Sequence, residues 1–107
     1  MKKAHIVKEA KDFDKAFKQR KQYVSKYYYL YIINQETDYR FGICVSKKIG
    51  NAVTRNKLKR QIKDIIDKSC LHFFNKDYII VLKKSIINAK YFEMKDDLVS
   101  LLNKINE

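Results

Sequence analysis

The chain has 107 residues, of which 46% are hydrophobic and 13% aromatic, so it can form one hydrophobic core and is too apolar for a disordered tail. Its 24 Lys and Arg residues outnumber its 12 Asp and Glu residues, which gives a formal net charge of +12. Such an excess argues against a surface built only for solubility and indicates a polyanionic partner, either an anionic membrane or, as we expect, a nucleic acid.

The chain contains no proline and only 2 glycines, so a flexible linker is not expected and residues 1–107 should form a single nucleic-acid-binding domain. Its first residues, Met1–Ala10, are polar and do not resemble a signal peptide. The longest apolar runs, Tyr27–Ile33 and Tyr78–Leu82, are too short to cross a bilayer. We therefore expect a cytoplasmic protein with no membrane partner.

Three segments in the first half of the chain have regular patterns. Lys8–Lys18 carries apolar side chains at helical spacing and predicts a helix. Tyr23–Asn34 is rich in Tyr and Ile and predicts two short strands broken near Ser25–Lys26, and Arg40–Ser46 alternates as another strand. We expect the two strand-forming runs to pair as a hairpin around the polar turn at Gln35–Asp38.

Alternation assigns the side chains of the first strand-forming run to two faces. One face takes an aromatic-rich set: Tyr27, Tyr29, Tyr31 and Ile33. The other face takes Tyr28, Leu30 and Ile32.

A basic loop, Lys47–Thr54, leads into a long helix predicted from about Thr54 to Phe73. The apolar positions of this helix recur at spacings of three and four: Leu58, Ile62, Ile65, Ile66, Cys70 and Phe73. Asp77–Leu82 is a continuous apolar run, which is typical of a buried central strand.

A last helix is predicted from about Ala89 to Ile105, with Asn88 as its N-cap and with Asp96 and Asp97 on its surface. Its inward side chains should be Tyr91, Met94, Leu98, Leu101, Leu102 and Ile105. The resulting order, α-β-β-β-α-β-α, predicts an α/β (α+β) two-layer sandwich in which helices pack on a sheet of about four strands.

The strongest local signal is a run of cations between Lys47 and Lys63 that contains no acid. On the predicted helix, Asn56, Arg60 and Lys63 lie four and three residues apart and form a stripe opposite the apolar positions. We call these three residues the basic stripe. Their guanidinium, ammonium and amide donors suit phosphate oxygens and RNA edges, whereas an ordinary solvated helix face interleaves acids with bases.

The run Val45-Ser46-Lys47-Lys48-x-Gly50-Asn51-Ala52-Val53-x-Arg55-Asn56-x-x-Lys59-Arg60 resembles the signature segment of bacterial ribonuclease P proteins. The resemblance extends over nearly the whole chain, including Phe13, Phe17, Tyr31 and the run Lys76–Ile80. It implies an α/β sandwich with a left-handed βαβ crossover, which is an exception to the usual right-handed rule. It also implies the protein subunit of an endoribonuclease that removes the 5′ leader of precursor tRNA.

The resemblance further implies two binding surfaces. The catalytic RNA, together with the substrate near its cleavage site, would meet Lys47, Lys48, Asn51, Arg55, Asn56, Lys59, Arg60 and Lys63. A cleft for the single-stranded leader would include Phe13, Phe17, Tyr29 and Tyr31. No residue of the protein would be catalytic or bind a metal ion, because magnesium would be held mainly by the RNA subunit, with one protein bound per RNA.

The residues alone leave the role of the aromatic side chains open. An aromatic strand face is usually buried in a core. Both faces of this strand are apolar, however, and only one must meet the helices, so the face with Tyr29 and Tyr31 also fits the stacking of single-stranded bases. For Phe13 and Phe17 the two interpretations are balanced, because an amphipathic helix needs core anchors.

The pattern does not indicate a protein-based active site. His5 and His72 lie far apart in the sequence, and acid pairs such as Asp64 and Asp67 on an exposed helix are usually solvated. A free-standing metallo-nuclease would need a converging cluster of acids, which the sequence does not suggest. The other alternative is a ribosomal or other structural RNA-binding protein of similar fold, in which the cleft aromatics would have no binding role.

Overall fold

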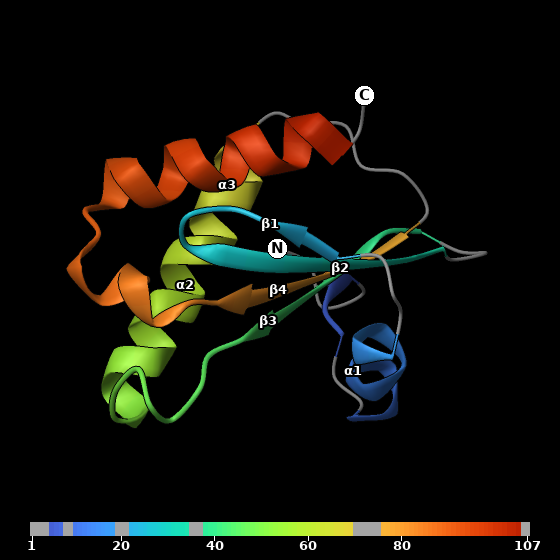
Figure 1. Ribbon diagram of the computed structural model, residues 1–107, viewed down its shortest axis with the longest axis horizontal. Coiled ribbons are helices and arrows are strands. Elements are labelled where there is room, and N and C mark those ends of the chain that lie inside the picture. The colour runs from blue at the N-terminus through green and yellow to red at the C-terminus, as the bar shows by residue number, and fades with distance from the viewer. Residues whose placement is uncertain (1–4, 8–9, 19–21, 35–37, 70–75, 106–107) are drawn as a thin grey trace.

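The computed structural model describes residues 5–7, 10–18, 22–34, 38–69 and 76–105. Its elements follow the predicted order and are shown in Figure 1: α1 (Ala10–Phe17), β1 (Gln22–Val24), β2 (Tyr28–Asn34), β3 (Arg40–Cys44), α2 (Ala52–Lys68), β4 (Lys76–Leu82), the 3₁₀ helix η2 (Lys84–Asn88) and α3 (Tyr91–Ile105). The break near Ser25–Lys26 separates β1 from β2 as predicted. No helix in these described segments is long and apolar enough to cross a membrane.

The four strands form one mixed sheet in the order β1-β2-β4-β3. The predicted hairpin between β2 and β3 is therefore wrong, because β4 lies between them, antiparallel to β2 and parallel to β3. The reason is burial: Tyr78, Ile79 and Ile80 of β4 are fully buried on both faces of the sheet. Such a strand is most favourable at the centre, where both of its faces are covered. The hairpin forms instead between β1 and β2.

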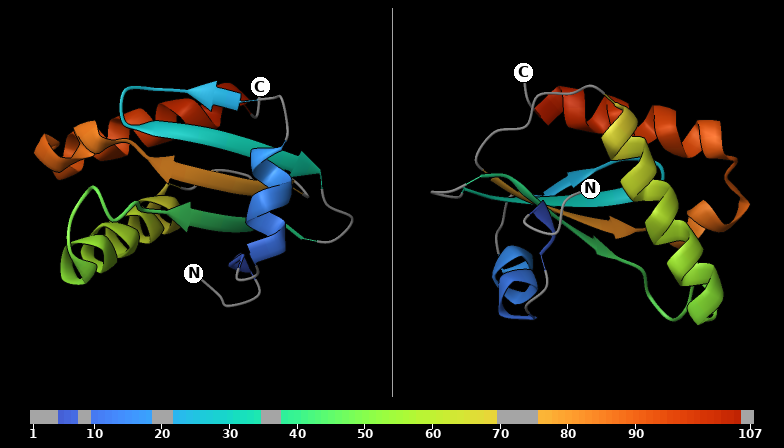
Figure 2. Two further views of the ribbon diagram at one scale, coloured as in Figure 1. Left: turned by 60° about the horizontal axis from the view of Figure 1, so that its bottom comes forward. Right: turned by 180° about the vertical axis from the view of Figure 1, so that it is seen from behind.

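The connection from β3 through α2 to β4 is the βαβ unit that the resemblance implies. In the left view of Figure 2, β3 and β4 point the same way and α2 lies behind the sheet. With these strands turned to point upward, the chain moves from β3 rightward to β4 through a helix on the far side. This is a left-handed crossover, as predicted.

The helices cover both faces of the sheet unequally. Helices α2 and α3 lie on one face and the short α1 lies on the other (Figure 2). The main core, between the sheet and α2 and α3, includes Tyr28, Leu30 and Phe41, and a smaller core under α1 joins Ala16 to Ile33 and Ile79. Alternation therefore places Tyr28 and Leu30 correctly, opposite Ile33.

Tyr27 departs from the predicted alternation. Its side chain is buried in the main core and not on the face of Tyr29 and Tyr31. Tyr27 lies in the bend before β2, where the strand alternation does not yet apply. Its backbone N–H donates to the Asp97 carboxylate at 2.9 Å, and the Ser25 hydroxyl donates to the same carboxylate oxygen at 2.8 Å. Asp97 is thus half-buried and holds this bend, which corrects its assignment as a surface residue.

The boundaries of α2 and the start of α3 differ from the predicted ones. Helix α2 starts earlier, because the Asn51 side chain caps it, and it ends at Lys68 with Ser69 as C-cap. Its buried side chains are the predicted ones: Leu58, Ile62, Ile65 and Ile66. The remaining two predicted apolar positions, Cys70 and Phe73, lie outside the described residues.

The predicted N-cap of α3, Asn88, is wrong, because Asn88 is the last residue of η2. The cap is supplied from inside the helix: the backbone N–H of Lys90 donates to the Glu93 carboxylate at 2.9 Å, which is half of a capping box. Tyr91, predicted to face inward, is exposed, and its hydroxyl donates to Asp64 of α2 at 2.6 Å. The other inward positions agree: Met94, Leu98, Leu101 and Leu102 are buried, and Ile105 packs against the main core.

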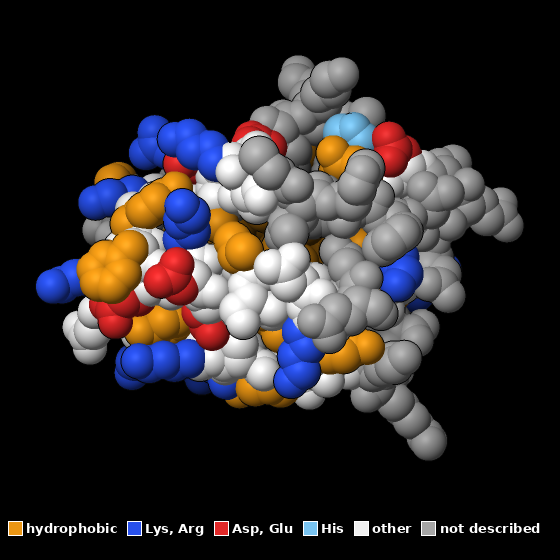
Figure 3. Space-filling view, turned by 90° about the horizontal axis from the view of Figure 1, so that it is seen from above, with side chains coloured by type: hydrophobic (Ala, Val, Ile, Leu, Met, Phe, Trp, Pro, Cys, Tyr) orange, Lys and Arg blue, Asp and Glu red, His pale blue; other side chains and the backbone are white. Residues whose placement is uncertain are grey.

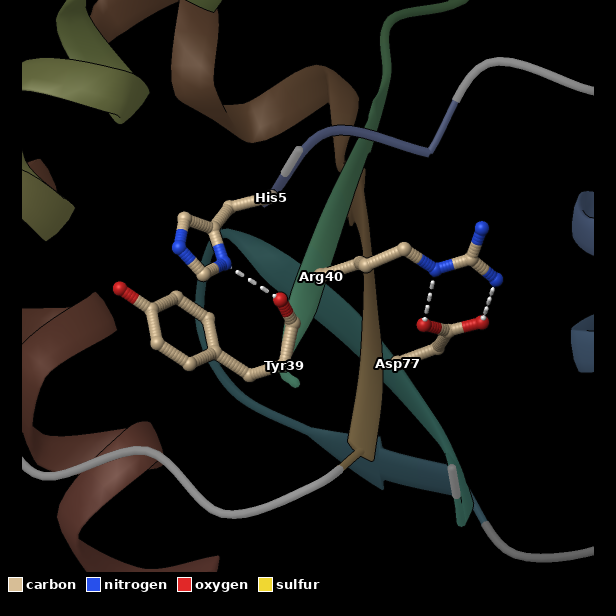
Figure 4. Close-up of polar contacts among 4 residues, drawn as sticks. All are labelled: His5, Tyr39, Arg40 and Asp77. Carbon is tan, nitrogen blue, oxygen red and sulfur yellow. Dashed lines mark hydrogen bonds and ion pairs between the residues drawn. The ribbon is translucent and has the colours of Figure 1, made fainter. Parts of the chain in front are cut away.

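Polar contacts surround the first residue of β3, Arg40, as Figure 4 shows. Arg40 and Asp77 are register partners on β3 and β4, and their side chains form an ion pair. The His5 ring stacks on Tyr39, with ring centroids 4.1 Å apart, and His5 Nδ1 lies 2.7 Å from the Tyr39 carbonyl oxygen. The backbone N–H of Val7 also donates to the Phe41 carbonyl at 2.9 Å. The contacts of His5 and Val7 attach residues 5–7 to Tyr39 and to Phe41 of the edge strand β3.

Candidate nucleic-acid interface

Helix α2 presents the basic stripe to solvent. Asn56 and Arg60 are exposed and Lys63 is half-buried, while the buried side chains of α2 lie on the opposite side. With Val53 and Lys59, the stripe lines an open depression along the helix. This facing is the one that the spacing predicts, because residues three and four apart share one side of a helix.

Helix α3, on the same face of the sheet as α2, has a different surface. Figure 3, which views the molecule from the side of α3, shows basic and acidic side chains interspersed among exposed hydrophobic ones. Exposed Lys95 and Asp96, for example, are adjacent. Mixed charge of this kind is typical of an ordinary solvated face. The acid-free run on α2 therefore distinguishes that helix as the better ligand for a polyanion.

The loop before α2 is held by its own polar groups. The Asn51 side-chain oxygen accepts from the Thr54 backbone N–H at 2.9 Å, so this oxygen is engaged as the N-cap of α2. Gly50 lies so close to Thr54 that an added Cβ would be 2.9 Å from the threonine methyl group. The Lys48 backbone N–H donates to the Ser46 hydroxyl at 3.1 Å, and exposed Lys47 and Lys48 flank the helix N-terminus.

Two further cations lie beside the stripe. Arg55 is half-buried, and its Nε atom is buried without a hydrogen-bond partner among the described residues. Such a group is costly unless another partner satisfies it. Burial raises the pKa of the Cys44 thiol of β3, and the positive charge of half-buried Lys59 on α2 opposes that rise.

The face of the sheet that α1 only partly covers carries exposed aromatic rings. Tyr29 is 36% exposed, with the Lys83 ammonium nitrogen 4.6 Å from its ring centroid. The Tyr31 ring meets Phe17 of α1 edge to face at 5.2 Å, and its hydroxyl accepts from the Gln22 side chain at 3.0 Å. The structure thus brings Phe17, Tyr29 and Tyr31 onto one face, which we call the aromatic face.

Phe13 and Phe17 differ in their surroundings, although both were assigned to one cleft. Phe13 packs against the core under α1, and its ring lies so close to Gly42 that an added Cβ there would be 2.6 Å from it. Phe17 is 44% exposed. Phe13 therefore anchors α1 on the sheet, and Phe17 is the one of the two that presents its ring to solvent.

Sequence reasoning missed two polar partners of the aromatic face. Lys83 directly follows β4, and its ammonium group lies over Tyr29 while donating to the Ser25 carbonyl at 2.6 Å. Gln22 begins β1 and reaches Tyr31 across the β1–β2 pair. The position of Lys83 at the end of a central strand was a usable signal, but the contact of Gln22 depends on pairing that no pattern in the sequence specifies.

The acidic residues form no obvious metal site in the described part of the chain, where no three His, Cys, Asp or Glu side chains converge. Asp64, one of the acids considered from the sequence, instead accepts from the Tyr91 hydroxyl and pairs with Lys68 at 3.1 Å. These two hydrogen bonds, that of Tyr91 first, lower the pKa of the Asp64 carboxyl.

Comparison with known proteins decides the family. Residues 1–106 match the family model described as Ribonuclease P. The chain belongs to the ribonuclease P protein family. The ribonuclease P protein component of Streptococcus pyogenes (serotype M5, strain Manfredo) is 37% identical over 103 residues, which cover 95% of this chain and 87% of that protein.

Solved structures of ribonuclease P proteins have the same fold. The Staphylococcus aureus RNase P protein superposes with a TM-score of 0.87 at 31% identity, covering 96% of each chain. The RNase P protein from Thermotoga maritima gives a TM-score of 0.82 at 26% identity, covering 92% of this chain and 94% of that one. Membership makes the chain the protein subunit of an endoribonuclease complex of tRNA processing, with ribonuclease P RNA as its partner. The alternatives of a ribosomal protein and a free-standing metallo-nuclease are thereby set aside.

Proposed function

We propose that the chain binds two RNA segments through two surfaces. The basic stripe, with Lys47, Lys48, Asn51, Arg55 and Lys59, binds ribonuclease P RNA and the substrate near its cleavage site. The aromatic face binds the single-stranded 5′ leader of precursor tRNA. The open depression on α2 carries this proposal, because every charged side chain that lines it, Lys59, Arg60 and Lys63, is a cation.

The two surfaces suit different parts of RNA. The cations and amides of α2 match phosphate oxygens, which position a complex without reading its sequence. The rings of Tyr29, Tyr31 and Phe17 offer planar apolar surface on which unpaired bases stack. Lys83, held over Tyr29, adds a positive charge beside that surface and suits the leader backbone.

In this proposal the protein binds and orients, and the RNA subunit carries the chemistry. Magnesium, held mainly by the RNA, supports attack of water on the phosphodiester bond, which leaves a 5′-phosphate on the mature tRNA. The side chains of this chain hold the leader away from the helical body of the tRNA and neutralise phosphate charge near the cut. One protein serves each RNA subunit, and the complex acts in the cytoplasm.

Cleavage of precursor tRNA with protein alone, RNA alone and both together tests this division of labour. Protein alone should give no cut in magnesium buffer, and both together should give one cut at the 5′ end of the mature sequence. Site-specific cleavage by the RNA-free protein would overturn the proposal.

A further inference from the structure

Val53 is the most exposed large hydrophobic side chain among the described residues, at 75%. It lies in the first turn of α2 and lines the same open depression as the basic stripe and Lys59. Every other side chain of that depression is a cation or an amide. Val53 is thus an isolated apolar surface at the end of a row of hydrogen-bond donors.

The fold does not account for a valine at this position. Val53 adds nothing to either hydrophobic core, and a β-branched residue lowers helix propensity relative to alanine. The start of the helix is already fixed by Asn51, which caps it. Single exposed hydrophobic residues are common on protein surfaces, so exposure alone would carry no conclusion. What distinguishes Val53 is its place within the surface that meets RNA.

We propose that Val53 is an apolar anchor for ribonuclease P RNA, packing on a ribose or an exposed base face of that RNA. The inference rests on the proposed function of the basic stripe and adds a residue with a different role. Cations bind phosphates at almost any position along a strand, so they supply affinity but little register. An apolar side chain gains from contact only where a sugar or base surface faces it. Val53 would therefore fix which nucleotide meets Asn56 and Arg60.

The substitution Val53→Thr tests this with little change in shape, because it replaces one methyl group by a hydroxyl. Thr and Val have similar helix propensities, and the side chain is exposed, so folding should be preserved. Affinity for a ribonuclease P RNA transcript should fall by roughly four- to tenfold, since the interface loses a methyl group and must desolvate a hydroxyl. The slope of log affinity against log salt should not change, because every cation that binds a phosphate is still present. Val53→Ile, which keeps the apolar surface, should retain wild-type binding.

Val24→Thr is the matched control, since it makes the same substitution at a valine that is 55% exposed and belongs to β1, outside the basic helix. It should bind the transcript as the wild type does. Wild-type affinity in Val53→Thr, or a weaker affinity accompanied by a smaller salt slope, would overturn the role of Val53. If Arg60→Ala still binds ribonuclease P RNA more weakly than the wild type, the proposed function stands even when the role of Val53 is wrong. If Val53→Thr and Arg60→Ala both bind the RNA with wild-type affinity, the proposed interface itself is wrong.

Discussion

The Arg40 guanidinium donates two hydrogen bonds to the Asp77 carboxylate, one from Nε at 2.8 Å and one from a terminal nitrogen at 2.6 Å. The two residues are register partners on the parallel strands β3 and β4, so the pair joins the starts of the two strands that the left-handed crossover connects (Figure 4). The environment is asymmetric: the Asp77 side chain is 3% exposed and that of Arg40 is 26% exposed. The buried Asp77 carboxylate has little access to water, so its charge is compensated mainly by Arg40, whereas the Arg40 guanidinium also has access to solvent.

That asymmetry predicts unequal costs for the two deletions. Arg40→Met should lower the free energy of unfolding by about 3–5 kcal/mol, because it leaves a buried carboxylate uncompensated. Asp77→Asn should cost less, since the half-exposed arginine can regain water. Denaturant unfolding of both variants measures the difference, and a larger loss of stability for Asp77→Asn would show that the pair is not organised by burial of the carboxylate.

A second link, between Tyr91 and Asp64, predicts a pH dependence. Hydrogen bonding lowers the pKa of Asp64 from its ordinary 3.8, so the stabilisation is present above that value and is lost as the pH falls through the lower folded-state pKa. The same bond raises the pKa of the Tyr91 hydroxyl, so the stabilisation is also lost at strongly alkaline pH. Tyr91→Phe should thus have a slightly lower melting temperature than the wild type at neutral pH and the same melting temperature in strong acid. An equal gap in melting temperature at both pH values would contradict this.

The sequence predicts local structure and facing well because these depend on short-range periodicity. The stripe of Asn56 and Arg60 opposite Leu58 and Ile62 follows from helical spacing alone, and the opposite faces of Leu30 and Ile33 follow from strand alternation. The resemblance supplied the handedness of the crossover, which no local pattern contains.

Features that depend on tertiary pairing could not be predicted in the same way. The prediction of a β2–β3 hairpin is wrong because the more apolar strand β4 lies at the centre of the sheet, between β2 and β3. The predicted facing of Tyr27 is wrong because its backbone N–H donates to Asp97, which is distant in the sequence. The interaction of Lys83 with Tyr29 likewise joins residues that only the folded sheet brings together.

The basic stripe leads to a prediction about salt. Arg60→Ala should weaken binding of ribonuclease P RNA and reduce the salt slope, by roughly 0.7–0.9 for each phosphate that is no longer neutralised. Folding should survive, because Arg60 is exposed on the side away from the core. Lys95→Ala, at an exposed lysine of the mixed-charge helix α3, is the matched control and should leave the slope unchanged. An equal change in both variants would mean that net charge, and not this surface, determines binding.

The aromatic face supports the most direct test of the proposed leader site. Tyr31→Ala should cost on the order of 1–3 kcal/mol in affinity of the reconstituted complex for precursor tRNA, the usual value of one base–aromatic stack. Mature tRNA has no leader, so its affinity should hardly change. Tyr31→Phe keeps the ring and removes only the hydroxyl that accepts from Gln22, so it should nearly preserve discrimination.

The decisive measurement is the ratio of precursor to mature tRNA affinity in complexes containing wild-type, Tyr31→Phe or Tyr31→Ala protein, each checked for folding by thermal melt. The account predicts a ratio near the wild-type value for Tyr31→Phe and a large decrease for Tyr31→Ala. An unchanged ratio in folded Tyr31→Ala protein would contradict it and would mean that the leader binds elsewhere.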